Sequence, residues 1–337
     1  MQKLLDRMAA LESAMQEAQR ERDAAARHLN RWRGLAAVLA LLVVVGLAPQ
    51  AGHAQLTIDQ RVAALEAKLK FLTTSGTSML ITGANLVIRN GGGGTGTTNG
   101  LGNLILGYNE MRPLNPNGTN PNLRTGSHNL VLGARNNYSS YSGMVAGDTN
   151  AIRAAFASVI GGYQNTASGY AAMVSGGQAN TASSTYASVS GGLSNIASST
   201  HTSVSGGYQN TARSAYASVS GGFQNIASGN SASVSGGRGN TAGFSFASVS
   251  GGEFNTASGT GSSVSGGGSN SATGGDASVS GGYLNLASGL TASVSGGAAN
   301  GAGGDYSSVS GGSNITQPNG VGWSGGGNSD AGFFHLP

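Results

Sequence analysis

The 337-residue sequence contains no cysteine, which excludes disulfide bonds, thiolate metal sites and cysteine nucleophiles. Charge is also sparse, because Asp, Glu, Lys and Arg make up only 9% of the residues. Seven of the 17 basic residues fall within the first 33 positions, and the rest are scattered. A nucleic-acid-binding domain has a clustered basic stripe, so we expect no nucleic-acid partner.

Proline is rare, with six residues, whereas glycine is abundant, with 59. Collagen needs glycine at every third position together with much proline, and this composition excludes it. The glycines are instead fixed to a 15-residue period, as in the pairs Gly161-Gly162 and Gly176-Gly177. Strict placement of this kind argues against disorder, which needs no register.

Paired catalytic groups are missing from the regular part of the chain. No two carboxylates fall in one period there, so an acid/base pair of the glycosidase kind has no candidate. The histidines are isolated and lack metal-ligand spacing; they are His28, His53, His128, His201 and His335. We therefore expect a protein that is not an enzyme and that holds neither a cofactor nor a metal.

The sequence Ser-Val-Ser-Gly-Gly recurs once in each period with little variation, and a short fixed period is typical of stacked structural units. The repeated valines are Val159, Val174, Val189, Val204, Val219, Val234, Val249, Val264, Val279, Val294 and Val309. An asparagine follows each of the first ten by six residues; these are Asn165, Asn180, Asn195, Asn210, Asn225, Asn240, Asn255, Asn270, Asn285 and Asn300.

The residue alternation within each unit predicts β-strands. Ala187 and Val189 share one face of a strand, and Ser188 and Ser190 share the other. Stacking the units places the valines in an inner ladder and the asparagines in a second ladder, where amides can bond along the stack. The sequence therefore predicts an all-β solenoid with 15-residue coils over residues 157–315.

Residues 77–156 predict irregular coils with loop insertions. Asn85–Ile88, Asn103–Leu106 and Asn129–Leu132 look like more apolar versions of the strand, and Met144 stands one full period before Val159. The insertion 108–127 contains three prolines, and insertions in solenoids often form the binding face. Its two arginines are candidate ligand contacts, namely Arg112 and Arg124.

Aromatic residues recur three positions before several of the valines. Tyr186, Tyr216 and Phe246 occupy this place, as do Phe156 and Tyr306. Residues at one coil position align along the stack at steps of about 4.8 Å. This stripe is expected either to pack against a partner chain or to contact a ligand.

The region 1–54 predicts a charged amphipathic helix followed by a signal peptide or signal anchor. Residues 34–48 form an uncharged apolar run that follows Arg31 and Arg33, and Gly52-His53-Ala54 offers small residues for cleavage. An uncleaved run would tether the chain to a membrane. Both alternatives place the chain from Gln55 onward outside the cytoplasm, because positive charges stay inside.

Residues 55–76 predict a short coiled coil, with apolar residues at alternating steps of four and three. Its seam consists of Ile58, Val62, Leu65, Leu69 and Leu72. The alternative is a single amphipathic helix packed on the end of the solenoid. At the other end, residues 316–337 predict a cap or tail, in which Trp323 and the Phe333-Phe334 pair cover the open core.

The predicted core is thin, since each coil buries little more than a valine, two alanines and glycine backbone. At about 25 cal/mol per Å² of apolar surface, this burial stabilises each ordered coil only weakly. Burial between neighbouring chains would add to it, so we expect an oligomer.

The units resemble the YadA-like head repeats of trimeric autotransporter adhesins, with Ala157–Gly169 as a typical example. The resemblance extends over about 129–314. It implies a left-handed parallel β-roll, a homotrimer without catalytic activity, and adhesion to extracellular matrix or glycan surfaces from a bacterial cell surface, or secretion. Two features depart from that family: the unit is one residue longer than the family's usual unit, and the chain after Gly320 lacks the alternation of the family's membrane-anchoring strands.

Two other functions remain open. A solenoid of this kind can serve as a structural spacer or sheath component. The Ser-Val-Ser strands also place two hydroxyls outward in each coil, which is reminiscent of the hydroxyl arrays of ice-binding solenoids.

Overall fold

The computed structural model describes Gln19, Arg22 and residues 57–325, and the chain divides into two compact units, Met1–Leu86 and Val87–Pro337. The predicted N-terminal helix, the apolar run 34–48 and the Phe333-Phe334 pair lie outside the described residues. Among the residues that are described, no helix is both long and apolar enough to cross a membrane.

In the first unit, helix α2 spans Ile58–Leu69 and begins with a capping box. Thr57 Oγ1 accepts from the backbone N–H of Gln60 at 3.3 Å, and Gln60 Oε1 accepts from that of Thr57 at 3.0 Å. The helix buries none of its residues. Its apolar side chains therefore have no packing partner among the described residues, and Ile58 is 76% exposed.

The predicted coiled-coil seam is wrong at Leu72, because the helix ends before it. Strand β1 (Leu72–Ser75) pairs antiparallel with β2 (Ser78–Ile81). The β-branched Thr73 and Thr74 favour a strand, and Gly76 takes a φ of 57° in the two-residue loop of the hairpin. The helical part of the prediction is confirmed only through Leu69.

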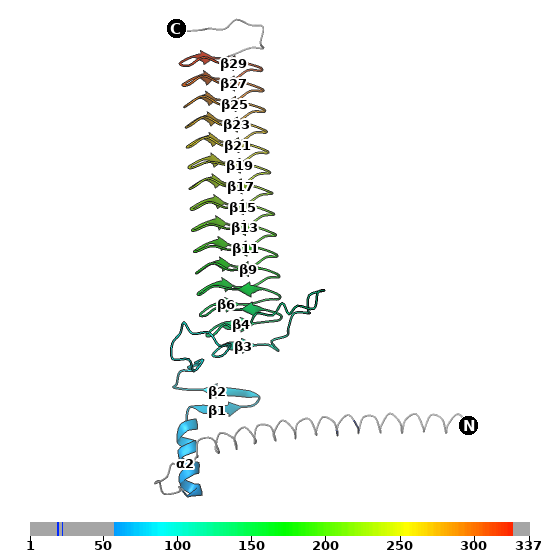
Figure 1. The fold of residues 1–337 in the computed structure, drawn as a ribbon, viewed down its shortest axis with the longest axis vertical. Helices are drawn as coiled ribbons and strands as arrows, with labels where there is room; N and C mark the ends of the chain where they lie inside the picture. Colours follow the sequence, from blue (N-terminus) through cyan, green and yellow to red (C-terminus); the bar gives the residue numbers. More distant parts are fainter. Residues whose placement is uncertain (1–18, 20–21, 23–56, 326–337) are drawn as a thin grey trace, which may run out of the picture. The chain divides into compact units, whose positions relative to one another are not determined.

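The second unit is a parallel β-solenoid, and this confirms the predicted fold class (Figure 1). Fifteen strands form one sheet, which we call the valine sheet: β3 (Leu104–Leu106), β4 (Leu130–Leu132), β6 (Met144–Val145), β8 (Ser158–Val159), β10 (Met173–Val174), β12 (Ser188–Val189), β14 (Ser203–Val204), β16 (Ser218–Val219), β18 (Ser233–Val234), β20 (Ser248–Val249), β22 (Ser263–Val264), β24 (Ser278–Val279), β26 (Ser293–Val294), β28 (Ser308–Val309) and β30 (Trp323–Ser324).

Thirteen strands form the second sheet, the alanine sheet: β5 (Asn137–Tyr138), β7 (Ala151–Ile152), β9 (Thr166–Ala167), β11 (Thr181–Ala182), β13 (Ile196–Ala197), β15 (Thr211–Ala212), β17 (Ile226–Ala227), β19 (Thr241–Ala242), β21 (Thr256–Ala257), β23 (Ser271–Ala272), β25 (Leu286–Ala287), β27 (Gly301–Ala302) and β29 (Thr316–Gln317). Each regular coil contributes one strand to each sheet. A glycine turn leads from the valine sheet to the alanine sheet, and a return turn leads back.

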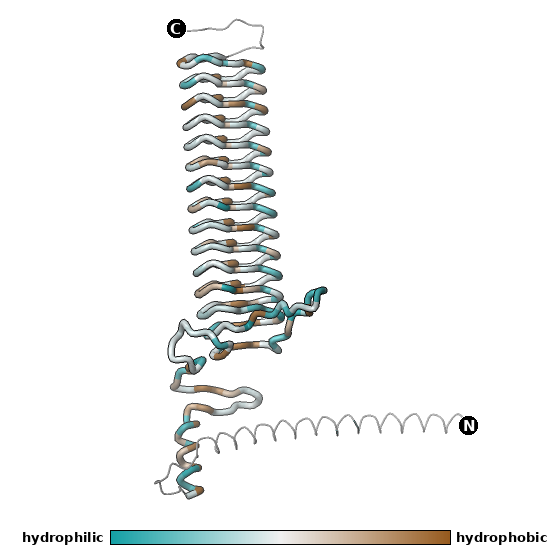
Figure 2. Tube along the Cα trace, viewed as in Figure 1, coloured by the Kyte–Doolittle hydropathy of each residue, from teal (hydrophilic) through white to brown (hydrophobic). Residues whose placement is uncertain are grey.

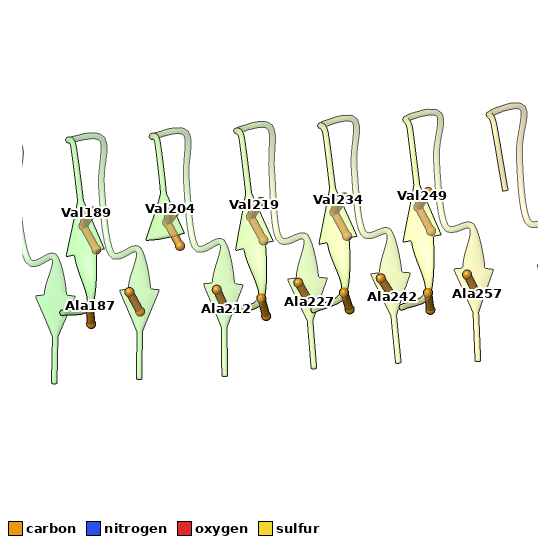
Figure 3. Close-up of a cluster of buried hydrophobic side chains, with 14 of the residues drawn as sticks. Ala187, Val189, Val204, Ala212, Val219, Ala227, Val234, Ala242, Val249 and Ala257 are labelled. Carbon is orange, nitrogen blue, oxygen red and sulfur yellow. The ribbon is translucent and has the colours of Figure 1, made fainter. Parts of the chain in front are cut away.

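The core lies between the two sheets and extends from Val131 to Ile315, and Figure 3 shows its middle part. All eleven repeated valines are at most 1% exposed, which confirms the predicted inner ladder. In the coil of Val189, the neighbouring Ala187 and Ala197 are also buried, while Ser190 and Ile196 face outward. Figure 2 shows the resulting recurrence of hydrophobic segments from coil to coil.

The two glycines of the glycine turn have different roles. Gly192 has a φ of 84°, and a Cβ there would lie 2.2 Å from the carbonyl oxygen of Gly207 in the next coil. By contrast, a Cβ on Gly191 would meet nothing within 4 Å. Close backbone approach between coils therefore requires the second glycine but not the first.

The first coils are shorter than predicted. Val131, Val145 and Val159 pair in register, so each of these steps is one residue shorter than the regular period, and Val145 and not Met144 occupies the inner column. These short coils have one glycine, such as Gly147, where the later coils have two. The extra residue is the sterically free first glycine. Asn103–Leu106 and Asn129–Leu132 contain strands as predicted, but Asn85–Ile88 contains none.

The stack continues through β30, past the predicted end at residue 315. Register pairs Val309 with Ser324, so Ser324 takes the valine position and donates to Gln317 Oε1 at 2.9 Å. Gln317 in turn takes the alanine position. Trp323 is 48% exposed on the outer face and does not cover the core, contrary to prediction, so the last described coil ends in a polar pair instead.

Candidate functional site

The asparagine ladder is a buried scaffold and not a binding site. In each regular coil the asparagine amide donates to two carbonyls, and its Oδ1 accepts from the backbone N–H of the residue one coil further on. For Asn195 the two carbonyl acceptors are Gly191 O and Gly207 O, each at 2.9 Å. All ten predicted asparagines are at most 1% exposed. The ladder therefore satisfies the turn backbone and leaves nothing for a ligand.

The two arginines of the insertion clamp the first coils. Arg112 donates to Arg135 O at 2.8 Å, to Thr149 O at 2.7 Å and to Asn150 O at 2.9 Å. Burial lowers the pKa of the Arg112 guanidinium. These bonds tie the insertion to the backbone of two coils.

Arg124 acts in the same way, with the backbone of the insertion itself among its acceptors. It donates to Asn136 O at 3.1 Å, to Asn109 O at 2.6 Å and to Glu110 O. The sequence placed Arg112 and Arg124 among candidate ligand contacts, but the structure engages both guanidinium groups with carbonyl oxygens. Loop composition gave no signal of this clamp.

An ion pair lies beside the clamp. Arg135 donates to both carboxylate oxygens of Asp148 in the next coil, at 2.8 Å from Nε to Oδ1. The hydrogen bond from Arg135 lowers the pKa of Asp148, and that from Thr149 adds to the effect. The hydrogen bond to Asp148 in turn raises the pKa of Arg135. The pair links two of the short coils. Without it, Arg135 and Asp148 would be two unpaired charges on the surface.

Six rings form a continuous array along the return turns, which we call the aromatic ladder: Tyr141, Phe156, Tyr170, Tyr186, His201 and Tyr216. Successive ring centroids are 5.0 to 5.9 Å apart. The sequence predicted Tyr186 and Tyr216 as contacts, and His201 joins them. Phe246 lies two coils beyond Tyr216 in the same column, with Ser231 between.

Ring orientation follows coil position. Tyr186, His201 and Tyr216 occupy one column and stack, with interplanar angles of 26° and 8°. Tyr170 occupies the neighbouring column, since its carbonyl accepts from the backbone N–H of Tyr186. It therefore meets Phe156 and Tyr186 edge to face, at 80° and 88°. A search confined to the position three before the valine overlooks Tyr170.

The stacked column lies on strained backbone. Phe156, Tyr186, His201 and Tyr216 have φ between 56° and 60°, a region that bulky residues rarely adopt and that costs about 1–3 kcal/mol each. Gly261 shows that glycine fits the same column, with a φ of 68°. Aromatic residues are therefore present there despite an energetic cost, which ring contacts offset in part.

A second aromatic column follows the glycine turns. Tyr208 stacks on Phe223 at 5.3 Å, and the Arg238 guanidinium lies 5.8 Å from the Phe223 ring and 5.3 Å from that of Phe254. Arg238 also pairs with Glu253 at 2.7 Å. The two charges of this column, on Arg238 and Glu253, are paired with each other.

Among residues 57–325, with Gln19 and Arg22, no three His, Cys, Asp or Glu side chains gather as a metal site would require. No protein-family model matches the chain, and a search of curated proteins finds no match. The function is therefore inferred from the chain's own surfaces.

Proposed function

We propose that this chain is an exported, non-enzymatic surface protein that assembles as a homotrimer and uses its solenoid as an adhesive head of the YadA-like kind. The observation that carries the proposal is a regular solenoid whose core contains only a valine and two small side chains in each coil. The outer surface of the solenoid also carries exposed apolar side chains, which a second chain can cover.

The core argument is quantitative. In the coil of Val219, the fully buried apolar side chains are Val219, Ala217 and Ala227. Burying a valine contributes about 1.5–3 kcal/mol and each alanine less, whereas ordering the coil costs about 1–2 kcal/mol per residue for the backbone alone. Backbone pairing between coils offsets part of this cost. Burial against neighbouring chains would offset more.

Exposed apolar residues along the glycine turns and the adjoining sheet face support this association. Leu193 and Phe223 on the glycine turns are each 37% exposed, and Tyr283 is 57% exposed. On the adjoining outer face of the alanine sheet, Ile196 is 39% and Leu286 41% exposed. A C3 assembly that covered these columns would leave the return turns, with the aromatic ladder, on the outside.

Helix α2 supports the same assembly. Its capping box fixes the start of a 12-residue helix, which would be marginal alone in water. Val62, Leu65 and Leu69 are 47%, 39% and 42% exposed, and they repeat at the spacing of a coiled-coil seam. Three such helices would bury one another's seams.

The experiment is sedimentation of the purified chain combined with attachment to coated surfaces. We expect a trimer that attaches to matrix-protein or glycan coatings. A trimer that attaches to neither would favour the spacer or sheath function instead, since a spacer needs the assembly but no ligand.

A further inference from the structure

We propose that the aromatic ladder, with Arg153 and Arg213 at its ends, binds a linear acidic polysaccharide. This names a ligand class for the proposed adhesive head. It rests on the proposed function in one respect, because the return turns must stay uncovered in the assembly. The ligand class follows from three properties of this surface: exposed rings, arginines that form no ion pair within the described part of the chain, and flanking hydroxyls.

The rings are open to solvent on one side of the stack. Phe156, Tyr170, Tyr186 and Tyr216 are 44%, 45%, 50% and 60% exposed. Tyr186, His201 and Tyr216 turn their faces toward one another along the stack, so a bound chain meets their edges, which carry positive charge density and suit an anion. The 5.0–5.9 Å step between ring centroids is close to the length of one sugar unit in an extended chain, so successive units can meet successive rings.

Charge selects an acidic chain over a neutral one. Residues 149–252 contain three arginines and one histidine but no Asp or Glu. Arg153 and Arg213 occupy one column, each three residues before a ladder ring, and the column has Ser168, Ser183 and Ser198 between them. Both arginines are exposed. Four coil steps of about 4.8 Å separate them, so a bound chain of several sugar units reaches both.

Hydroxyls border the rings and suit the hydroxyl groups of a glycan. In the coil of Tyr186 the preceding residues are Ser183, Ser184 and Thr185, and all three are at least partly exposed. Side chains of this kind donate and accept, so they can bond to sugar hydroxyls of either polarity. A purely apolar partner would leave them unsatisfied. The surface therefore fits a polyhydroxylated anion better than a protein helix.

The test uses the full chain in mild detergent and measures binding to alginate octasaccharide, a linear polyuronate, by titration calorimetry at two salt concentrations. We expect binding that weakens as salt rises. The double variant Tyr186→Ser/Tyr216→Ser should bind at least about tenfold more weakly, because it removes two exposed aromatic side chains that the bound chain contacts. The double variant Arg153→Gln/Arg213→Gln should also bind more weakly and lose most of the salt dependence.

Matched controls lie elsewhere on the same solenoid. Tyr306→Ser removes a 60% exposed ring at the same coil position but outside the ladder, and Arg238→Gln removes an arginine that is paired with Glu253. Both should bind within about twofold of the unchanged chain, the scatter expected where no contact is lost. Serine is tolerated at these positions, because Ser231 occupies the same column with a φ of 55°. Circular dichroism on each variant checks the fold.

The inference would be overturned if the chain did not bind alginate, or if the Tyr186→Ser/Tyr216→Ser variant bound it as tightly as the unchanged chain with its fold intact. It would also be overturned if polyglutamate or an oligothymidylate bound as tightly as alginate, because that would mean charge attraction alone. Sedimentation of the same samples separates this inference from the broader proposal. A trimer that attaches to matrix proteins but ignores alginate loses only the glycan site, whereas a monomer that binds alginate keeps the site and loses the trimer.

Discussion

The side-chain oxygen of Asn210 accepts a hydrogen bond from the backbone N–H of Asn225 at 2.9 Å, and Asn225 bonds in the same way to Asn240. Each asparagine thus supports the next coil. Because the relationship repeats without interruption from Asn150 to Ile315, it couples the coils along the stack. The last such bond among the described residues is donated by the backbone N–H of Ile315 to Asn300 Oδ1, and Ile315 has no side-chain amide to continue the ladder.

Replacing Asn225 with Ala should destabilise the solenoid by at least about 1–3 kcal/mol, the cost of one buried group left unsatisfied. The orphaned group is the N–H of Asn240. Thermal unfolding measures the loss, and hydrogen exchange should locate it in the coils on either side. The control is Gln224→Ala, at an exposed position whose column already contains Ala179. Equal effects of the two changes would contradict the role given to the ladder.

The glycine pair offers a sharper comparison. Gly192→Ala places a Cβ 2.2 Å from Gly207 O on positive-φ backbone, so we expect a loss of more than about 3 kcal/mol or failure to fold. Gly191→Ala meets open space and should change stability by less than about 1 kcal/mol. Deleting Gly191 should also be tolerated, since the coil of Gly147 is complete with one glycine. Denaturation of the three variants under the same conditions measures these differences. A large loss of stability on replacing or deleting Gly191 would contradict the different roles given to the two glycines.

Arg112→Gln should loosen the first coils, because three carbonyl contacts from one guanidinium are lost. We expect faster hydrogen exchange in residues 108–150 and little change beyond Val159. Arg89→Gln, at an exposed position earlier in the chain, is the matched control. Equal hydrogen-exchange rates of residues 108–150 in wild type and Arg112→Gln would show that Arg112 does not clamp these coils.

The Arg135–Asp148 pair predicts an acid-dependent loss of stability. The pKa of Asp148 is lowered in the folded chain, so its contribution is complete above the ordinary Asp pKa of about 3.9. It disappears as the pH falls through the lower, folded-state pKa. Melting temperatures of wild type and Asp148→Asn should therefore differ near neutral pH and converge only once the pH has fallen below the lowered pKa of Asp148. A constant difference across that range would count against the pair.

Much of the fold was predictable because the period is strict. The valines from Val159 to Val309 repeat without a break. In a strand where serines flank the valine, the valine face is the apolar one and is therefore the face that is buried. The asparagine ladder followed from the same register. The coil of Val145 was misassigned to Met144 because one glycine is absent there, and only the backbone pairing reveals which residue lies inside.

The errors arose where contacts are not periodic. Leu72 continues the heptad spacing, yet the hairpin loop at Gly76 competes with the helix and prevails. The clamp by Arg112 depends on a fold-back of the insertion that no local pattern encodes. Tyr170 joins the aromatic ladder from the adjacent column, so its role depends on how neighbouring coils stack. Such features require the three-dimensional arrangement of the coils.

The coiled-coil seam of helix α2 can be tested by a single change. Leu65→Asp places a charge in the proposed interface, so the variant should dissociate at higher concentrations than the unchanged chain or melt at a lower temperature. Glu66→Asp, one residue away and off the seam, is the control. If both variants sediment as the unchanged chain does, helix α2 takes no part in the assembly.

The most direct measurement of the central claim is the solution mass of the purified chain by sedimentation equilibrium, with the mass of bound detergent matched out. A homotrimer gives three times the chain mass of 33.2 kDa, and it should persist at low micromolar concentration. A mass of one chain, with the solenoid still folded by circular dichroism, would contradict the trimeric head.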